Sequence, residues 1–179
     1  MKTLLIALVG FFLSVTLTGA EEPTTQPATQ MIADVVNGRV EIAGKTFVLG
    51  THADALVDQL GKPDSDGGGD YERVISYAKS LGFWAVANKG QITGFVFFLR
   101  AGGTDTAKLN RPNVKTVEGI GANSTRAQIE NAYGKPETAN ERGEVISLYY
   151  AKKTFHLDKD GLFQILMSDG RNYLHSIDQ

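Results

Sequence analysis

The feature that most restricts the fold of this chain is a pair of short motifs that recur at one interval. Gly61-Lys62-Pro63 and Gly134-Lys135-Pro136 stand 73 residues apart, and Tyr77-Ala78-Lys79 and Tyr150-Ala151-Lys152 share that interval. Two matches in the same register are hard to obtain by chance, and self-similarity at a fixed period is typical of repeat architectures. The sequence therefore predicts two copies of one small structural unit.

Each copy begins with the signals of a short helix. In the first copy, Thr51 is a potential N-cap and Gly61 ends the stretch of helical periodicity. In the second copy, Ser124 or Thr125 is the potential cap and Gly134 ends the helix. Short apolar runs after each helix predict strands at about residues 74–78, 83–87 and 91–99, and again at 145–151, 154–157 and 162–167.

An Asn37-Gly38 pair between two apolar runs predicts a hairpin ahead of the first helix, because both positions of such a turn favour a positive φ. We therefore expect an α+β fold, made of two tandem helix-plus-antiparallel-sheet repeats preceded by a short β-hairpin. The expected organisation is a signal peptide at 1–20, a disordered spacer at 21–31, the hairpin and first repeat at 32–100, a linker at 101–113, and the second repeat at 114–179.

The amino terminus predicts export. Lys2 precedes an uncharged apolar run from Leu4 to Leu17, and Thr18-Gly19-Ala20 supplies the small residues that a signal peptidase requires. We expect cleavage after Ala20, no stable membrane span afterwards, and a periplasmic or secreted location. The chain has no cysteine, which excludes disulfides, lipid attachment at a cysteine and thiol catalysis.

Charge argues against a nucleic-acid partner. The leader carries one of the 18 Lys and Arg residues and none of the 20 Asp and Glu residues, so the remaining chain has a formal charge of −3. Binding to phosphates needs a concentration of Lys and Arg on one surface. We therefore expect no nucleic-acid binding.

The order of a capped helix, Gly-Lys-Pro, a polar loop, a strand ending in Tyr and a Gly-turn hairpin resembles the repeat of the SmpA/OmlA (BamE) envelope lipoproteins. It is also similar to the tandem unit of the beta-lactamase inhibitor proteins. The resemblance covers roughly residues 46–100 and 116–168. It implies small helices over one face of an antiparallel sheet, with the other face available to a protein partner.

Few residues of the sequence suggest a catalytic site or a metal site. The three histidines are far apart in the sequence, and no Gly-x-Ser-x-Gly motif is present, so we expect neither an enzyme nor a cofactor. Asp64, Asp66 and Asp70 lie in a glycine-rich stretch and are weak candidates for a calcium site, although the closing Glu of an EF-hand loop is missing. The expected role of this stretch is a solvated loop.

The predicted contact surface is one face of the sheet. Strand alternation in the second copy, transferred to the first through the Tyr77/Tyr150 and Gly90/Gly161 matches, assigns five residues to an outer, aromatic face: Phe83, Phe95, Phe97, Tyr149 and His156. Exposed aromatic patches usually mark contact sites. The alternative is that the amino-terminal hairpin or the other copy covers these rings.

These observations together predict an exported, non-enzymatic protein-binding module that acts as an envelope assembly component or in the manner of an inhibitor. The alternative function is a secreted small-ligand or calcium-binding protein that uses the Asp- and Gly-rich stretch.

Overall fold

The computed structural model describes residues 30–69, 71–100 and 109–170. Within them the chain forms two helices of eight residues each, α1 (Ala53–Leu60) and α2 (Arg126–Tyr133). The strands are β1 (Gln30–Asp34), β2 (Arg39–Ile42), β3 (Lys45–Val48), β4 (Ser65–Gly68), β5 (Arg73–Tyr77), β6 (Phe83–Asn88), β7 (Gln91–Phe98), β8 (Asn113–Thr116), β9 (Thr138–Arg142), β10 (Val145–Tyr150), β11 (Lys153–Asp158) and β12 (Gly161–Ser168).

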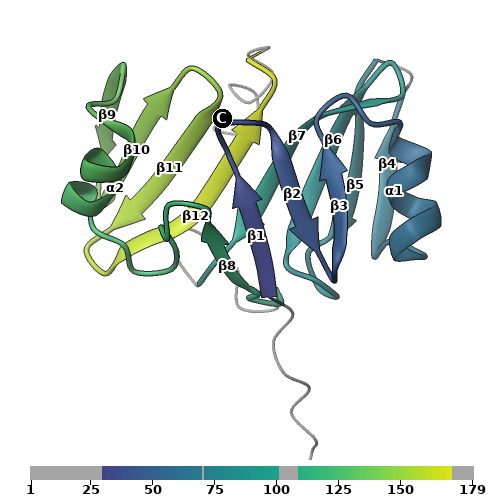
Figure 1. The fold of residues 1–179 in the computed structure, drawn as a ribbon, viewed down its shortest axis with the longest axis horizontal. Coiled ribbons are helices and arrows are strands. Elements are labelled where there is room, and N and C mark those ends of the chain that lie inside the picture. The colour runs from purple at the N-terminus through teal and green to yellow at the C-terminus, as the bar shows by residue number, and fades with distance from the viewer. Residues whose placement is uncertain (1–29, 70, 101–108, 171–179) are drawn as a thin grey trace, which may run out of the picture.

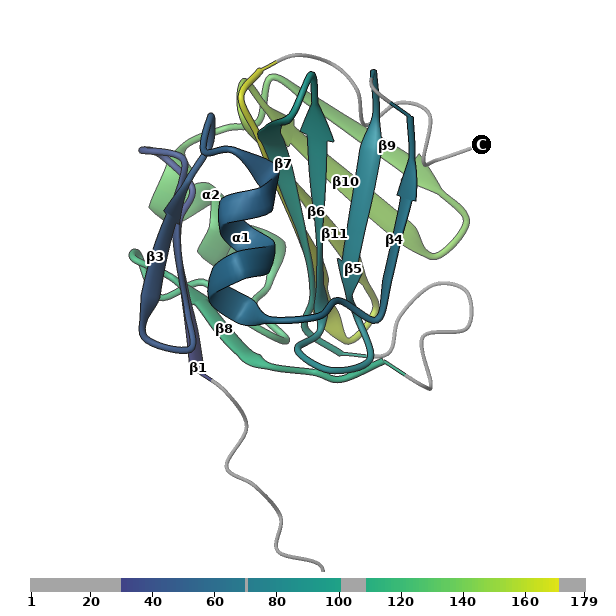
Figure 2. The ribbon, with the colours of Figure 1, turned by 90° about the vertical axis from the view of Figure 1, so that its right-hand side faces the viewer.

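The strands form two sheets that pack face to face. The larger has eight strands in the order β4-β5-β6-β7-β12-β11-β10-β9, and the smaller has four in the order β3-β2-β1-β8. Figure 1 shows the small sheet in front of the large one, with α1 and α2 at opposite ends of the molecule. The quarter turn in Figure 2 places α1 between β3 and the large sheet. The two helices therefore lie on either side of the small sheet, against the same face of the large sheet.

The predicted α+β class, with two tandem helix-plus-sheet repeats, is wrong. The fold is mostly β, and its only helices in the described ranges are two short ones. Pairing of β7 with β12 joins strands from both halves of the chain into one continuous sheet. The predicted hairpin is likewise part of a larger unit, because β3 and the parallel strand β8 extend β1 and β2 into a sheet.

The core lies between the two sheets. Buried side chains of the small sheet, Met31, Ile42 and Phe47 among them, face buried rings of the large sheet. The helices add fully buried residues to this core, Ala53 and Leu56 from α1 and Ile129 from α2. Because the chain has no cysteine, burial of this apolar surface is the main stabilising contribution within the fold.

Local signals place both helices near their predicted positions. Thr125, one of the two predicted caps, caps α2, and it forms a capping box with Gln128. α1 is capped by His52 and not by Thr51, since the His52 Nδ1 accepts from the Asp54 N–H at 3.4 Å. Gly61 ends α1 at a φ of +84°, a conformation that suits glycine.

The β1–β2 connection differs from the predicted turn. Asp34 pairs with Arg39, so the loop contains four residues, and only Gly38 among them has a positive φ. Paired positive φ values occur instead at the turns Ala43-Gly44 and Lys89-Gly90. The four-residue loop is favoured because the Asp34 carboxylate accepts hydrogen bonds from the backbone and side chain of Asn37.

Several predicted boundaries need correction. The expected loop around Asp64–Asp70 contains β4, and the polar stretch before Val145 contains β9. Every residue of these edge strands is exposed, which explains their polar sequences. The spacer was predicted to run to residue 31, but β1 already begins at Gln30. The linker was predicted to run to residue 113, but β8 already begins at Asn113.

The predicted signal peptide at 1–20, residues 21–29 of the predicted spacer and residues 101–108 of the predicted linker lie outside the described residues. Within the ranges that are described, no helix is long and apolar enough to cross a membrane.

Candidate functional site

The predicted outer placement of Phe83, Phe95 and Phe97 is wrong. Each of the three is 0% exposed and lies in the core between the sheets. Their rings contact one another, with centroids 6.0–6.2 Å apart. The small sheet covers them, so these side chains are not available to a partner in this structure.

A register error of one residue explains the wrong placement. Asn88 pairs with Gln91, so Gly90 lies inside the β6–β7 turn. Asp158 pairs with Gly161, so Gly161 already belongs to β12. The two glycines are not equivalent, and a shift of one residue along a strand transfers every side chain to the opposite face.

Tyr149 and His156 do lie on the outer face of the large sheet, opposite the buried Leu148 and Phe155. Tyr149 is partly exposed, whereas His156 is buried, and its Nδ1 lies 2.8 Å from the Ser147 Oγ on the neighbouring strand. This face therefore presents less accessible aromatic surface than the sequence suggests.

The carboxylates proposed as weak calcium ligands have other partners. Asp64 accepts from the backbone N–H groups of Lys79 and Ser80 at 2.7 and 3.0 Å. Both oxygens of Asp66 bind Arg73. Asp70 lies outside the described residues, and within those residues no group of three His, Cys, Asp or Glu side chains is arranged to hold a metal ion.

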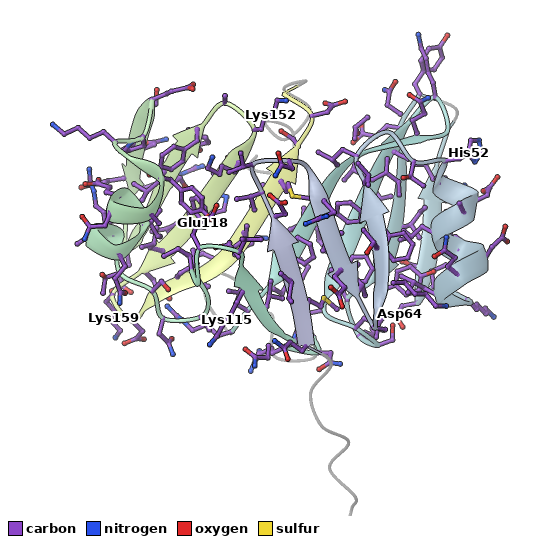
Figure 3. All side chains as sticks on the ribbon, viewed as in Figure 1. His52, Asp64, Lys115, Glu118, Lys152 and Lys159 are labelled. Carbon is purple, nitrogen blue, oxygen red and sulfur yellow. The ribbon has the colours of Figure 1, made fainter. Side chains whose placement is uncertain are left out.

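A different site forms where three loops meet at one end of the large sheet. The loop before α1 is joined to the β6–β7 hairpin by three backbone hydrogen bonds: Gly50 N–H to Ile92 O at 2.7 Å, Ile92 N–H to Thr51 O at 2.8 Å, and Ala53 N–H to Gly90 O at 2.8 Å. The turn between β4 and β5 completes the site. Figure 3 shows His52 beside α1 at this outer end of the molecule.

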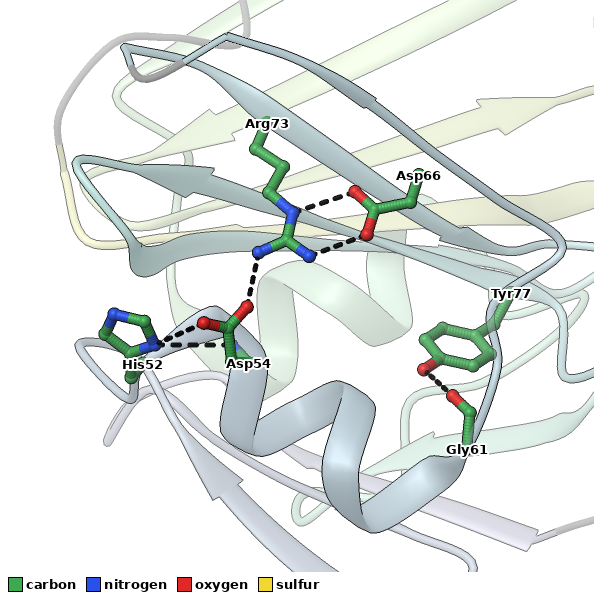
Figure 4. A network of polar contacts seen from close by, with 6 residues as sticks. All are labelled: His52, Asp54, Gly61, Asp66, Arg73 and Tyr77. Carbon is green, nitrogen blue, oxygen red and sulfur yellow. Dashed lines mark hydrogen bonds and ion pairs between the residues drawn. The ribbon is translucent and has the colours of Figure 1, made fainter.

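An arginine on β5 organises the charges at this site (Figure 4). Arg73 binds Asp66 through Nε and Nη2 at 2.8 and 2.6 Å, and it binds Asp54 of α1 through Nη1 at 2.7 Å. Hydrogen bonds from Arg73 lower the pKa of both carboxyls, and the bonds to Asp66 and Asp54 raise the pKa of Arg73 itself. The cluster therefore stays ionised at neutral pH and ties α1 to the β4–β5 hairpin.

These residues surround an open hollow of about 510 Å³, here named the α1 hollow, which is lined by His52, Asp54, Gly69, Tyr71, Arg73, Lys89 and Gly90. Tyr71 is 77% exposed, the highest value among the large hydrophobic residues left exposed in the described ranges.

Sequence reasoning missed Tyr71, Arg73 and Lys89. These residues lie on two hairpins, and only the folded sheet brings them to His52 at the start of α1. The Arg and Asp residues around position 70 did not indicate a binding site, because mixed charges are also typical of solvated loops.

The Arg73 cluster predicts a pH-dependent effect of Arg73→Gln. The folded pKa of Asp54 and Asp66 is lowered, so their contribution to stability is present above the unfolded value of about 4 and is lost as the pH falls through the lowered values. We expect Arg73→Gln to lower the melting temperature at pH 7, and the difference from the parent protein to shrink below about pH 4.

Thermal melts from pH 7 to pH 2 measure this difference. Lys89→Gln is the matched control, because Lys89 lines the same hollow but takes part in no ion pair among the described residues. A difference between parent and Arg73→Gln that does not change with pH would contradict the assignment of the two carboxylates.

Comparisons with known proteins identify no family. No family model matches the sequence, and no curated protein matches it. One solved structure with a detectable likeness is an extracellular protein containing a SCP domain from Bacillus anthracis str. Ames, with a TM-score of 0.43 and 10% sequence identity. The match covers 68% of this chain and 44% of that one, so this chain spans less than half the length of the protein that it resembles.

Proposed function

We propose that the chain is an exported, non-enzymatic protein-binding module and that the α1 hollow is its contact site. The observation that carries the proposal is an exposed tyrosine, Tyr71, beside an arginine that is held in place by two carboxylates. Tyrosine and arginine are enriched among the residues that dominate protein–protein binding energy.

Pre-organisation supports this proposal. Backbone hydrogen bonds join the loop before α1 to the β6–β7 hairpin, and the Gly69 N–H donates to Glu72 O at 2.8 Å in the β4–β5 turn. Arg73 is held at 2.6–2.8 Å by its partners, so these groups have little conformational freedom to lose on binding. The Asn88 side-chain amide also donates to the backbone carbonyl of Tyr71, which fixes the hairpin that carries the ring.

The alternative of a calcium-binding protein loses support from the same contacts. Asp66 has both oxygens on Arg73, and Asp64 accepts backbone hydrogen bonds on the β5–β6 turn. Calcium requires six to eight oxygen ligands, and coordination by Asp66 would require its ion pair to break.

Site-specific photo-crosslinking tests the contact site. A photoreactive phenylalanine analogue replaces Tyr71, and in a parallel protein it replaces Val117, which is 59% exposed on the small-sheet side of the molecule. After irradiation in the exported fraction of the producing cells, we expect a discrete protein adduct from position 71 and none from position 117. Once the adduct partner is purified, Tyr71→Ala should weaken its binding by about tenfold or more.

A charge variant makes the test sharper. Lys89→Glu changes a side chain on the rim of the hollow without removing a described contact, and it should reduce the yield of the position-71 adduct. Equal adducts from positions 71 and 117, or none from either position, would contradict the proposal.

A further inference from the structure

The β1–β2 loop contains a chemically labile dipeptide. Asn37 is exposed, and Gly38 follows it with a φ of +67°. The sequence has other asparagines, but each of them is followed by a residue with a side chain. A side chain on the following residue hinders attack by its backbone nitrogen on the asparagine amide, and glycine removes this hindrance.

Three hydrogen bonds hold Asn37 in place. Its backbone N–H donates to Asp34 Oδ1 at 3.1 Å, and its Nδ2 donates to Oδ1 and Oδ2 at 3.2 and 3.0 Å. The side chain of Asp34 is only 10% exposed, and Arg39 lies 3.4 Å from it. The amide hydrogen bond from Asn37 is the main cause of the lowered pKa of Asp34.

We propose that Asn37 is a site of spontaneous deamidation, that Asp34 restrains the reaction, and that the product opens the β1–β2 hairpin. The Gly38 backbone nitrogen loses its proton and forms a bond to Asn37 Cγ, while the Cγ–Nδ2 bond breaks and ammonia leaves. Water then opens the cyclic imide at either carbonyl and yields aspartate or isoaspartate. No cofactor or oxidant takes part.

Deamidation would disrupt the β1–β2 loop because it turns the side chain at position 37 from a hydrogen-bond donor into an acceptor. The amide of Asn37 is a donor to Asp34, whereas the carboxylate that replaces it is an acceptor with a negative charge. Two carboxylates would then face each other at hydrogen-bonding distance, beside the Arg39 guanidinium that lies 3.4 Å from Asp34. The hairpin covers Phe83, Phe95 and Phe97, so its opening would expose the centre of the core.

Peptide mapping by mass spectrometry after incubation of the folded protein at mildly alkaline pH tests the proposal. The other asparagines are internal controls, and we expect conversion at Asn37 to exceed conversion at each of them. Asp34→Ala should accelerate conversion at Asn37 by about tenfold, since it removes the hydrogen bonds that hold the side chain.

Two further variants separate the proposed chemistry from simple loss of stability. Leu56→Ala weakens the core but leaves the Asp34–Asn37 contacts intact, so it should accelerate conversion at Asn37 less than Asp34→Ala does. Asn37→Asp imitates one product and should increase amide hydrogen exchange in β1 and β2 specifically. Conversion at Asn37 no faster than at the other asparagines, equal acceleration by Leu56→Ala, or unchanged exchange in Asn37→Asp would each overturn the proposal.

Discussion

Replacement of Phe95 by alanine should lower the free energy of unfolding by about 3 to 5 kcal/mol. The ring is 0% exposed and lies 6.2 Å from the Phe83 ring and 6.0 Å from the Phe97 ring, measured between centroids. Its removal leaves a cavity between two sheets whose backbones are fixed by strand pairing, so the surrounding residues cannot close the space without breaking hydrogen bonds.

Urea denaturation followed by tryptophan fluorescence and circular dichroism measures this loss. Tyr71→Ala is the matched control, because it also removes an aromatic ring but from a position that is 77% exposed, and its effect should stay within about 0.5 kcal/mol. A loss below about 1 kcal/mol for Phe95→Ala would show that the ring lies on an accessible face after all.

Gly161→Ala should destabilise the protein by about 2 to 5 kcal/mol, through backbone strain and overpacking together. Gly161 has a φ of +97°, and an added Cβ would lie 2.6 Å from the backbone oxygen of Asn123. The added Cβ and the Asn123 carbonyl oxygen are both held in place by the backbone, so no flexible side chain can move aside. Relief therefore requires movement of the turn that leads into α2, where the Asn123 N–H also donates to Leu162 O at 3.0 Å.

Gly143→Ala separates the two causes. Gly143 also has a positive φ, +61°, but an added Cβ there would have no atom within 4 Å. This variant should therefore show only the backbone cost of about 1 to 2 kcal/mol. Equal losses for the two variants in the same denaturation experiment would mean that the close approach of Asn123 to Gly161 does not contribute.

Local features of the sequence predicted local structure well. Helix signals at Gly61, Thr125 and Gly134 correspond to real helix ends and a real cap, because these signals act within one or two turns of the chain. The cap at His52 was missed, since histidine is not among the usual N-cap residues, and its ring accepts only a long 3.4 Å hydrogen bond.

Edge strands were harder to predict. Ser65–Gly68 is polar and glycine-rich and Thr138–Arg142 is polar, which is typical of loops. These segments become strands because β5 and β10 offer them backbone partners. Hydrogen bonds of this kind do not depend on side-chain type, so composition carries little information about them.

The sequence by itself determined where the helices and most strands lie along the chain, because capping, turn and alternation signals involve neighbouring residues. Only the tertiary structure decided which strands are neighbours and which face of the large sheet is covered. Pairing of β7 with β12 and of β1 with β8 joins residues that are distant in the sequence, and one extra residue in a turn reverses the faces of a strand. The burial of Phe95 and the meeting of Tyr71, Arg73 and His52 in the α1 hollow follow from these long-range contacts, which the order of residues does not specify locally.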